Sequence, residues 1–143
     1  MRDIRGLMSG REPVYPRIVR RVAVHSVVRT ACEDARLFAD AADLSANDAA
    51  RLCIIVEEIV TNIFEHGGSP FAEVSLELDR DCVHIALVDA GKSFDPRSRP
   101  MEPATTGVGG GAGLALVRGW AKVLGYGSAV GRNRLELLMP LRT

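Results

Sequence analysis

The sequence has few cysteines, no long apolar run and no surplus of charge of either sign. Its three cysteines, Cys32, Cys53 and Cys82, are odd in number and far apart, with no Cys-x-x-Cys pair. This argues against a disulfide framework and a zinc site, and it favours a reducing cytoplasm. We expect all three to be small buried hydrophobic side chains. No apolar run approaches the roughly 20 residues that span a bilayer, and no signal-peptide pattern follows the N-terminus.

The charge balance also narrows the function. Lys and Arg total 18 and Asp and Glu total 18, so the formal net charge is zero. Proteins that bind nucleic acid directly usually carry a basic surplus, and this chain has none. With 143 residues and 47% hydrophobic content, the chain fits a single domain over 1–143. Arginines are frequent in the first 21 residues; we expect 1–15 to be a loose N-terminal arm, with contact to a polyanion as the alternative.

The first half of the chain has the pattern of one strand and two helices. β-Branched residues predict a strand near Ile18 to Val24, and an apolar side predicts a helix over 26–42. Ser45, with Asp48 three residues later, is suited to cap the next helix. That helix should continue to the Gly67-Gly68 pair, where a C-terminal glycine is expected.

The second half has mainly the pattern of strands. Residues 71–91 alternate apolar and polar side chains on two strands joined by a tight turn near Asp79 to Asp81. The long loop from Gly91 to Gly111 is too long for a simple connector and is expected to be functional. A third helix over 111–125, closed by Gly125, and a hairpin over 126–139 complete the chain. We therefore expect an α+β, two-layer sandwich with helices on one sheet face.

The stretch IVEEIVTNIFEHGG, residues 55–68, combines a buried-helix pattern with polar side chains. Glu58, Asn62 and His66 are spaced i, i+4, i+8 and should share one face. The Asn62 amide oxygen is a suitable ligand for Mg²⁺, and Glu58 could orient or deprotonate an attacking hydroxyl. The alternatives are structural: Glu58 paired, Asn62 bonded to backbone, and His66 interacting with the helix dipole.

The second polar cluster is VDAGKSFDP, residues 88–96, in which Asp89 and Gly91 directly follow a strand. A carboxylate only accepts hydrogen bonds, so Asp89 would select an amino group such as that of adenine. A plain strand-to-turn Asp-x-Gly is the alternative. A methyltransferase motif fits less well, because Ser93 replaces the next glycine and too little chain remains for a parallel sheet.

The third cluster is a glycine loop that leads into a helix, with five glycines in residues 107–113. Backbone amides that converge on a helix N-terminus form an anion site suited to phosphates. No Lys-Ser/Thr follows the last glycine, as a Walker loop requires, and no strand precedes it, as a dinucleotide fingerprint requires. A flexible surface loop is the alternative.

In order along the chain, these clusters resemble the motifs of a known superfamily. EIVTN (58–62), DAG (89–91) followed by SFDP (93–96), and GGAGLALV (110–117) resemble the N, G1 and G2 boxes of the GHKL ATPases. VEEIVTNIFEHG with VDAGKSFDP and a short lid is most similar to the bacterial anti-sigma-factor serine kinases. The resemblance covers roughly residues 20–140.

This resemblance implies a Bergerat fold, with a mixed, largely antiparallel sheet, helices on one face, and a site for ATP and Mg²⁺. It implies Asn62 on Mg²⁺, Glu58 as the catalytic base, and Asp89 on adenine with Gly91 against the ring. The complete set of implied nucleotide-binding residues is Asn62, His66, Asp89, Gly91, Phe94, Gly109, Gly110, Gly111, Gly113 and Leu114. The sequence departs from the family at Ser93, where a second glycine is common, and at Ala112, where a basic residue is common; Arg97, Arg99 and Arg118 are candidates to replace that charge.

The function implied is that of an ATP-dependent protein serine/threonine kinase that is also an anti-sigma factor. In such a partner-switching module the protein holds a sigma factor or a STAS-type antagonist, and phosphorylation of the antagonist releases it. Relatives are commonly homodimers, so a homodimer is expected. Two alternatives remain: a nucleotide-gated protein-binding module with little kinase activity, and a detached histidine-kinase-type catalytic domain. The second needs a phosphoaccepting histidine on a dimerisation helix, and His25 has no such setting.

Overall fold

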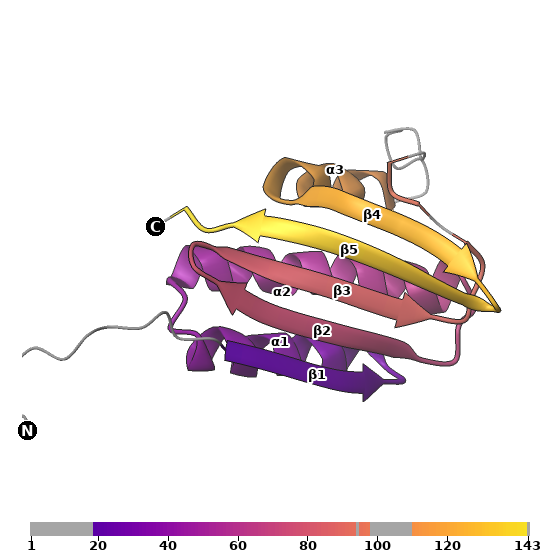
Figure 1. The fold of residues 1–143 in the computed structure, drawn as a ribbon, viewed down its shortest axis with the longest axis horizontal. Coiled ribbons are helices and arrows are strands. Elements are labelled where there is room, and N and C mark those ends of the chain that lie inside the picture. Colours follow the sequence, from indigo (N-terminus) through magenta and orange to yellow (C-terminus); the bar gives the residue numbers. More distant parts are fainter. Residues whose placement is uncertain (1–18, 94, 98–109, 143) are drawn as a thin grey trace, which may run out of the picture.

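A computed structural model describes residues 19–93, 95–97 and 110–142 of the chain. It confirms the predicted α+β sandwich: a five-stranded sheet with helices against one face (Figure 1). The predicted N-terminal arm lies outside the described residues. In chain order the elements are β1 (Val19–His25), α1 (Val28–Ala41), α2 (Ala46–Thr61), the π-helical turn η2 (Asn62–His66), β2 (Ala72–Asp79), β3 (Cys82–Asp89), α3 (Gly110–Trp120), β4 (Lys122–Ala129) and β5 (Arg132–Pro140).

The strands lie in the order β1-β2-β3-β5-β4. All four strand pairs of the described residues are antiparallel, so the expectation of a mixed sheet is wrong for this part of the chain. Tight turns between β2 and β3 and between β4 and β5 make these neighbours antiparallel. Arg80 has a φ of 62° in the first turn, while Val130 and Gly131 have φ values of 53° and 72° in the second.

The core lies between the helices and one face of the sheet. In β3 and β5, and in β2 as far as Leu76, every second residue is buried, as a sheet covered on one side requires. Among the fully buried side chains are Phe38 of α1, Ile55 and Ile59 of α2, Ile85 of β3 and Leu137 of β5. In the described part of the chain, no helix is long and apolar enough to span a membrane.

The second helix begins where the sequence predicted, and a π-helical turn extends it to the predicted glycine pair. The Ser45 hydroxyl accepts a hydrogen bond of 3.1 Å from the Asp48 amide, which confirms the predicted cap. The α-helix itself continues only to Thr61, and the last turn is π-helical. Gly67 follows that turn, and Gly68 has a φ of 70°, a conformation that favours glycine.

The prediction of a third helix over 111–125 is wrong for its last five residues. The helix ends at Trp120, and β4 already begins at Lys122. Pairing with β5 overrides the local helical pattern, because strand formation depends on neighbouring strands. The register shifts between Val123 and Gly125, so Gly125 lies at an irregularity of the strand and not at a helix end.

The three cysteines are free, as predicted, but only partly buried. Cys53 packs against the edge of the core from α2. Burial raises the pKa of the Cys32 thiol to about 11, with a further contribution from Glu57, so this thiol stays protonated at neutral pH.

Candidate nucleotide-binding site

Asp89 lies at the end of β3 with its carboxylate buried and partly hydrogen-bonded. Asp89 is only 7% exposed. Oδ1 accepts 2.8 Å from the Gly91 amide and 2.9 Å from Asn133 Nδ2. Within the described residues Oδ2 accepts no hydrogen bond. One oxygen is therefore held by the protein and the other is available to a ligand.

Gly91 allows the loop after β3 to lie directly against the end of the second helix. A Cβ on Gly91 would lie 2.6 Å from the carbonyl oxygen of Gly67 and 3.0 Å from the amide of Ser69. These neighbours are backbone atoms, so any side chain would force the two segments apart. The Lys92 amide donates to the Gly67 carbonyl at 2.9 Å and closes the contact. The glycine thus fixes Asp89 relative to the turn that carries Asn62.

Asn62 is the first residue of the π-helical turn and is 5% exposed. Its Nδ2 is buried without a hydrogen-bond partner, and in the described part of the chain its Oδ1 makes no hydrogen bond either. An unsatisfied buried amide costs about 1–3 kcal/mol. The predicted structural alternative, a hydrogen bond from Asn62 to backbone, is therefore not what the structure has. π-Helical turns are frequent at functional sites.

Asn62 and Asp89 line the same small cavity between η2 and the ends of β3, β4 and β5. Its volume is about 20 Å³, enough for one water molecule. Lys92 and Tyr126 are also part of its wall. An adenine ring is much larger than a water molecule, so this cavity alone is too small to enclose one. Asn62 of the predicted N box and Asp89 of the predicted G1 box nevertheless lie against the same cavity.

Glu58 lies one turn before Asn62, against the first turn of α3. Its carboxylate occupies the space that a Cβ on Gly113 would fill. No hydrogen bond or salt bridge engages this carboxylate among the residues that the structure describes. Burial raises the pKa of the Glu58 carboxyl, Glu57 raises it further and His66 lowers it. An unpaired carboxylate with a raised pKa has the properties of a general base.

The glycine-rich loop ends in the first turn of α3, as predicted. Gly110 and Gly111 begin this helix, so the amide groups of its first turn lack intrahelical partners. Leu114, also predicted to contact nucleotide, is 4% exposed and belongs to the hydrophobic core. The predicted contacts of Phe94 and Gly109 lie outside the described residues. His66, also predicted to contact nucleotide, is exposed, and its position near Glu58 lowers the pKa of that carboxyl.

The arginines considered as replacements for the missing basic residue are engaged elsewhere. Arg97 donates from Nε and Nη2 to the Asp95 carboxylate, at 3.0 and 2.7 Å. Arg118 donates to the Pro96 carbonyl and ties α3 to this segment. Arg99 lies outside the described residues. In the described residues, Arg97 and Arg118 thus each have a partner within the protein.

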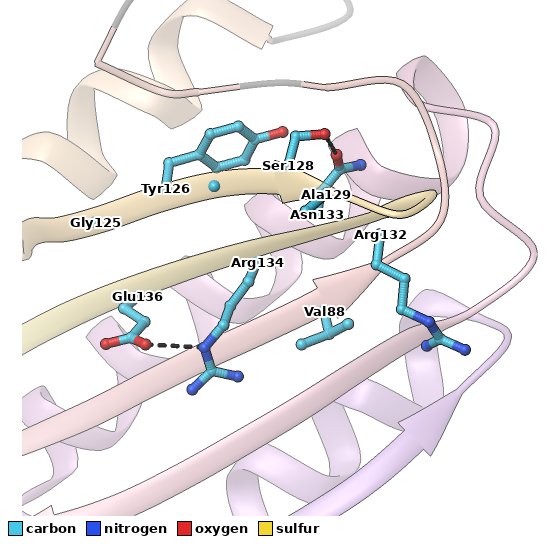
Figure 2. A pocket seen from close by; sticks show the side chains of 10 residues that line it. Val88, Gly125, Tyr126, Ser128, Ala129, Arg132, Asn133, Arg134 and Glu136 are labelled. Carbon is cyan, nitrogen blue, oxygen red and sulfur yellow. Dashed lines mark hydrogen bonds and ion pairs between the residues drawn. The ribbon is translucent and has the colours of Figure 1, made fainter.

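Asn133 is a site residue that the sequence analysis missed. It stands opposite Asp89 in the β3–β5 register and is 2% exposed. Its Oδ1 accepts 2.7 Å from the Ser128 hydroxyl, which is directed at it from the neighbouring strand (Figure 2). The Ser93 and Ser128 hydroxyls are 3.2 Å apart. Ser93, the departure from the glycine pattern, is therefore the outer end of a hydrogen-bond chain that leads to Asp89.

A wider hollow of about 650 Å³ lies over β4 and β5 (Figure 2). Arg132, Arg134 and Glu136 line it and alternate along β5 with the buried residues. The hollow reaches neither Asn62 nor Glu58, so its size alone does not make it the nucleotide site.

A match to a known protein family agrees with this arrangement. A comparison with curated proteins finds no significant match. Residues 23–139 match the family described as the histidine kinase-like ATPase domain. The match includes the three boxes and nearly all of the described fold. The chain therefore belongs to the histidine kinase-like ATPase domain family, a member of the GHKL superfamily.

Proposed function

We propose that the protein is an ATP-dependent serine/threonine kinase that acts as an anti-sigma factor in a partner-switching module. Its substrate would be a STAS-type antagonist, its second partner a sigma factor, and its active form a homodimer. The observation that carries the kinase assignment is Glu58: a carboxylate without a pairing partner in the described residues, one turn from Asn62 and against the start of α3. The resemblance of the boxes to those of the serine kinases supports the choice of substrate.

The residues of the candidate site each have a role in this proposal. MgATP, when bound, would supply the phosphoryl group and the metal that neutralises its charge. Asn62 Oδ1 would hold the metal, and Asp89 Oδ2 would accept from the adenine amino group. The free amides of the first turn of α3 would bind phosphate oxygens. Glu58 would take the proton of the partner's hydroxyl as it attacks. The unpartnered atoms of Asn62 and Asp89 fit this ligand.

The histidine-kinase-type alternative is less well supported by the fold. It needs a phosphoaccepting histidine on an exposed dimerisation helix. His25 lies in β1, is 8% exposed and has its Nδ1 3.0 Å from the Thr30 hydroxyl. His84 lies in β3, and His66 ends the π-helical turn. The binding-module alternative is favoured by Ala112, which cannot supply charge to a phosphate.

Incubation with ATP labelled at the γ-phosphate and a cognate antagonist separates these functions. Acid-stable label on the antagonist supports the serine/threonine kinase. Acid-labile label indicates transfer to histidine, and nucleotide binding without transfer indicates a binding module. A pull-down from the native cell extract supplies the antagonist, and a reaction without added Mg²⁺ and ATP is the nucleotide-free control.

Asp89→Asn should weaken ATP binding by about 1–3 kcal/mol, or roughly 5- to 150-fold. The asparagine amide adds a donor that meets the amino hydrogens of adenine. Calorimetric titration with ATP, ADP and GTP measures the effect, and the wild-type protein should bind GTP poorly. Equal wild-type affinity for ATP and GTP would show that Asp89 does not read the base.

Asn62→Ala should abolish most of the Mg²⁺-dependent tightening of ATP binding while the fold persists. The substitution removes the proposed metal ligand and also the buried unpaired amide, so the melting temperature should not fall much. Asn62→Asp keeps an oxygen ligand and is the matched control, since it should retain the magnesium dependence. If Asn62→Ala shows the same magnesium dependence as the wild type in calorimetry, Asn62 has a structural role instead.

A further inference from the structure

Asn133 uses all of its side-chain hydrogen-bonding groups within the protein. Nδ2 donates to Asp89 Oδ1 at 2.9 Å and to the Gly91 carbonyl at 2.8 Å. Oδ1 accepts from the Ser128 hydroxyl. No hydrogen of this amide remains for a ligand, so Asn133 does not read a base itself. Instead, Asn133 fixes one oxygen of Asp89 relative to the loop after β3.

The position of Asn133 depends on the register of β5. It faces the helices because it lies two residues after Gly131, in the turn that sets how β4 and β5 pair. A shift of one residue would send its side chain to the opposite face of the sheet. Ser128, its partner on β4, is opposite it in the same register. The β4–β5 hairpin therefore places an amide donor beside the Asp89 carboxylate.

We infer that Asn133 is a positioning residue that sets the base specificity of the nucleotide site. By occupying Oδ1 together with the Gly91 amide, it turns Oδ2 toward the cavity that Asp89 shares with Asn62. Without it, only the Gly91 amide would hold Oδ1, so the carboxylate would rotate more freely and Oδ2 would be held less well toward a donor of the ligand. Asn133 has this role only if Asp89 reads the adenine amino group, so the assignment rests on the proposed function.

The test compares two nucleotides that differ only at the group in question. ATP carries the amino group, and purine riboside triphosphate has hydrogen in its place. Asn133→Ala should weaken ATP binding about 10-fold, because Asp89 would no longer be held in position and its hydrogen bond to the amino group would be weakened. Purine riboside triphosphate should lose less than about twofold, since it makes no contact with Asp89. Asn47→Ala, at an exposed position in the first turn of α2, is the matched control and should change neither affinity.

Calorimetry with both nucleotides and a melting curve distinguishes the outcomes. Equal losses for the two nucleotides would mean that Asn133 only supports the fold, and no loss would mean that Asp89 is held without it; either overturns the inference. If Asn133→Ala does not fold, Ser128→Ala at an exposed strand position replaces it, and a smaller loss confined to ATP is expected. An unchanged affinity in Ser128→Ala would then overturn the inference. A wild type that binds both nucleotides equally would overturn it together with the role of Asp89, whereas selective ATP binding without phosphotransfer would overturn the kinase proposal alone.

Discussion

Glu58→Gln should slow phosphorylation of the partner protein by about 10²- to 10⁴-fold while ATP binding stays near normal. Glutamine fills the same space against Gly113 but cannot take a proton. Under the proposed function, binding of ATP, a sigma factor and an antagonist would not need the proton transfer. In a partner switch the variant would stay bound to its antagonist, because it could not phosphorylate that partner to release it. A time course of label transfer beside an ATP titration measures both effects.

The raised pKa of Glu58 fixes the sign of two further effects of this substitution. In the folded protein the carboxyl holds its proton above the ordinary pKa of 4.5, so ionised Glu58 opposes folding once the pH exceeds both values. Glu58→Gln should therefore melt at the same temperature as the wild type or higher at neutral pH, and the difference should vanish below pH 4.5. In the wild type, the acidic limb of the rate profile should lie above that pH, since the base must be ionised.

Glu57→Gln is the matched control for Glu58→Gln. Glu57 is the adjacent residue of the same helix, but its side chain is exposed. We expect Glu57→Gln to phosphorylate the partner protein at a rate within about twofold of the wild type, the range of ordinary surface substitutions. If Glu57→Gln phosphorylates slowly and Glu58→Gln at the wild-type rate, Glu57 is the base. If Glu58→Gln unfolds the domain, its carboxylate has a structural role that the described contacts do not reveal.

Local patterns were sufficient to predict most of the fold. The Ser45 cap, the alternation along β2 and β3, and the glycine at the end of the second helix each depend on neighbours within a few residues. The helix predicted through Gly125 failed because the strand at that place depends on β5, which follows later in the chain. Strand pairing is a tertiary effect that a local pattern does not contain.

The same distinction applies to the candidate site. Asp89, Asn62 and Glu58 stand in short motifs whose residue types and spacing suggest their chemistry. Asn133 stands in a strand with no motif around it, and its importance comes from the register that places it opposite Asp89, 44 residues away in sequence. An amide at the start of a strand after a tight turn was the only available signal, and it is a weak one. The close approach of Gly91 to Gly67 is likewise visible only once the two segments are packed.

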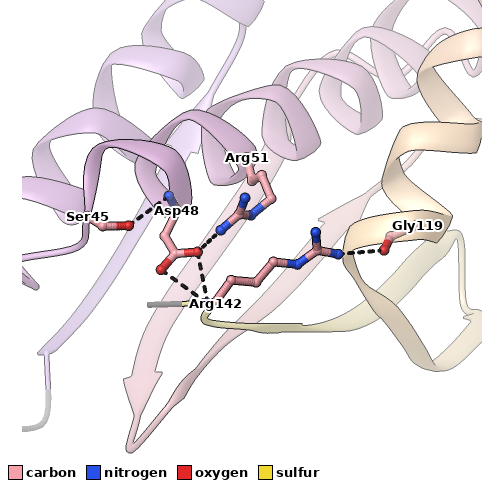
Figure 3. A network of polar contacts seen from close by, with 5 residues as sticks. All are labelled: Ser45, Asp48, Arg51, Gly119 and Arg142. Atoms are coloured by element: carbon pink, nitrogen blue, oxygen red, sulfur yellow. Dashed lines mark hydrogen bonds and ion pairs between the residues drawn. The ribbon is translucent and has the colours of Figure 1, made fainter.

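A buried ion pair far from the site determines how firmly the second helix is held. Asp48, in the first turn of α2, is 1% exposed and pairs with Arg51. Its two carboxylate oxygens also accept from the Arg142 amide, at 3.1 and 3.3 Å. The Arg142 side chain donates to the Gly119 carbonyl at 3.2 Å, so the network joins the start of α2, the end of α3 and the segment after β5 (Figure 3). Three elements that are distant in sequence depend on one carboxylate.

Asp48→Ala should lower the free energy of unfolding by about 3–5 kcal/mol, the loss expected when one partner of a buried ion pair is removed. The buried Nε of Arg51 already lacks a hydrogen-bond partner, and the substitution would also remove the carboxylate that pairs with its guanidinium. The Arg142 amide would lose its acceptor. For a domain of this size, that loss corresponds to a decrease of about 10–20 °C in melting temperature. Thermal and urea unfolding followed by circular dichroism measure it.

Asp40→Ala is the control for this substitution, because Asp40 is an exposed carboxylate on α1 and its loss should change stability by less than about 0.5 kcal/mol. Asp48→Asn should be intermediate, since it keeps an acceptor for the Arg142 amide but not the charge that pairs with Arg51. Well below its melting temperature, Asp48→Ala should still bind ATP, because Glu58 and Asn62 lie at the other end of the helix, which Gly67 and Lys92 anchor independently. An unchanged melting temperature would mean that the network does not hold the three elements together in solution. Loss of ATP binding in a protein that is still folded would mean that the anchor at Asp48 also sets the position of the nucleotide site.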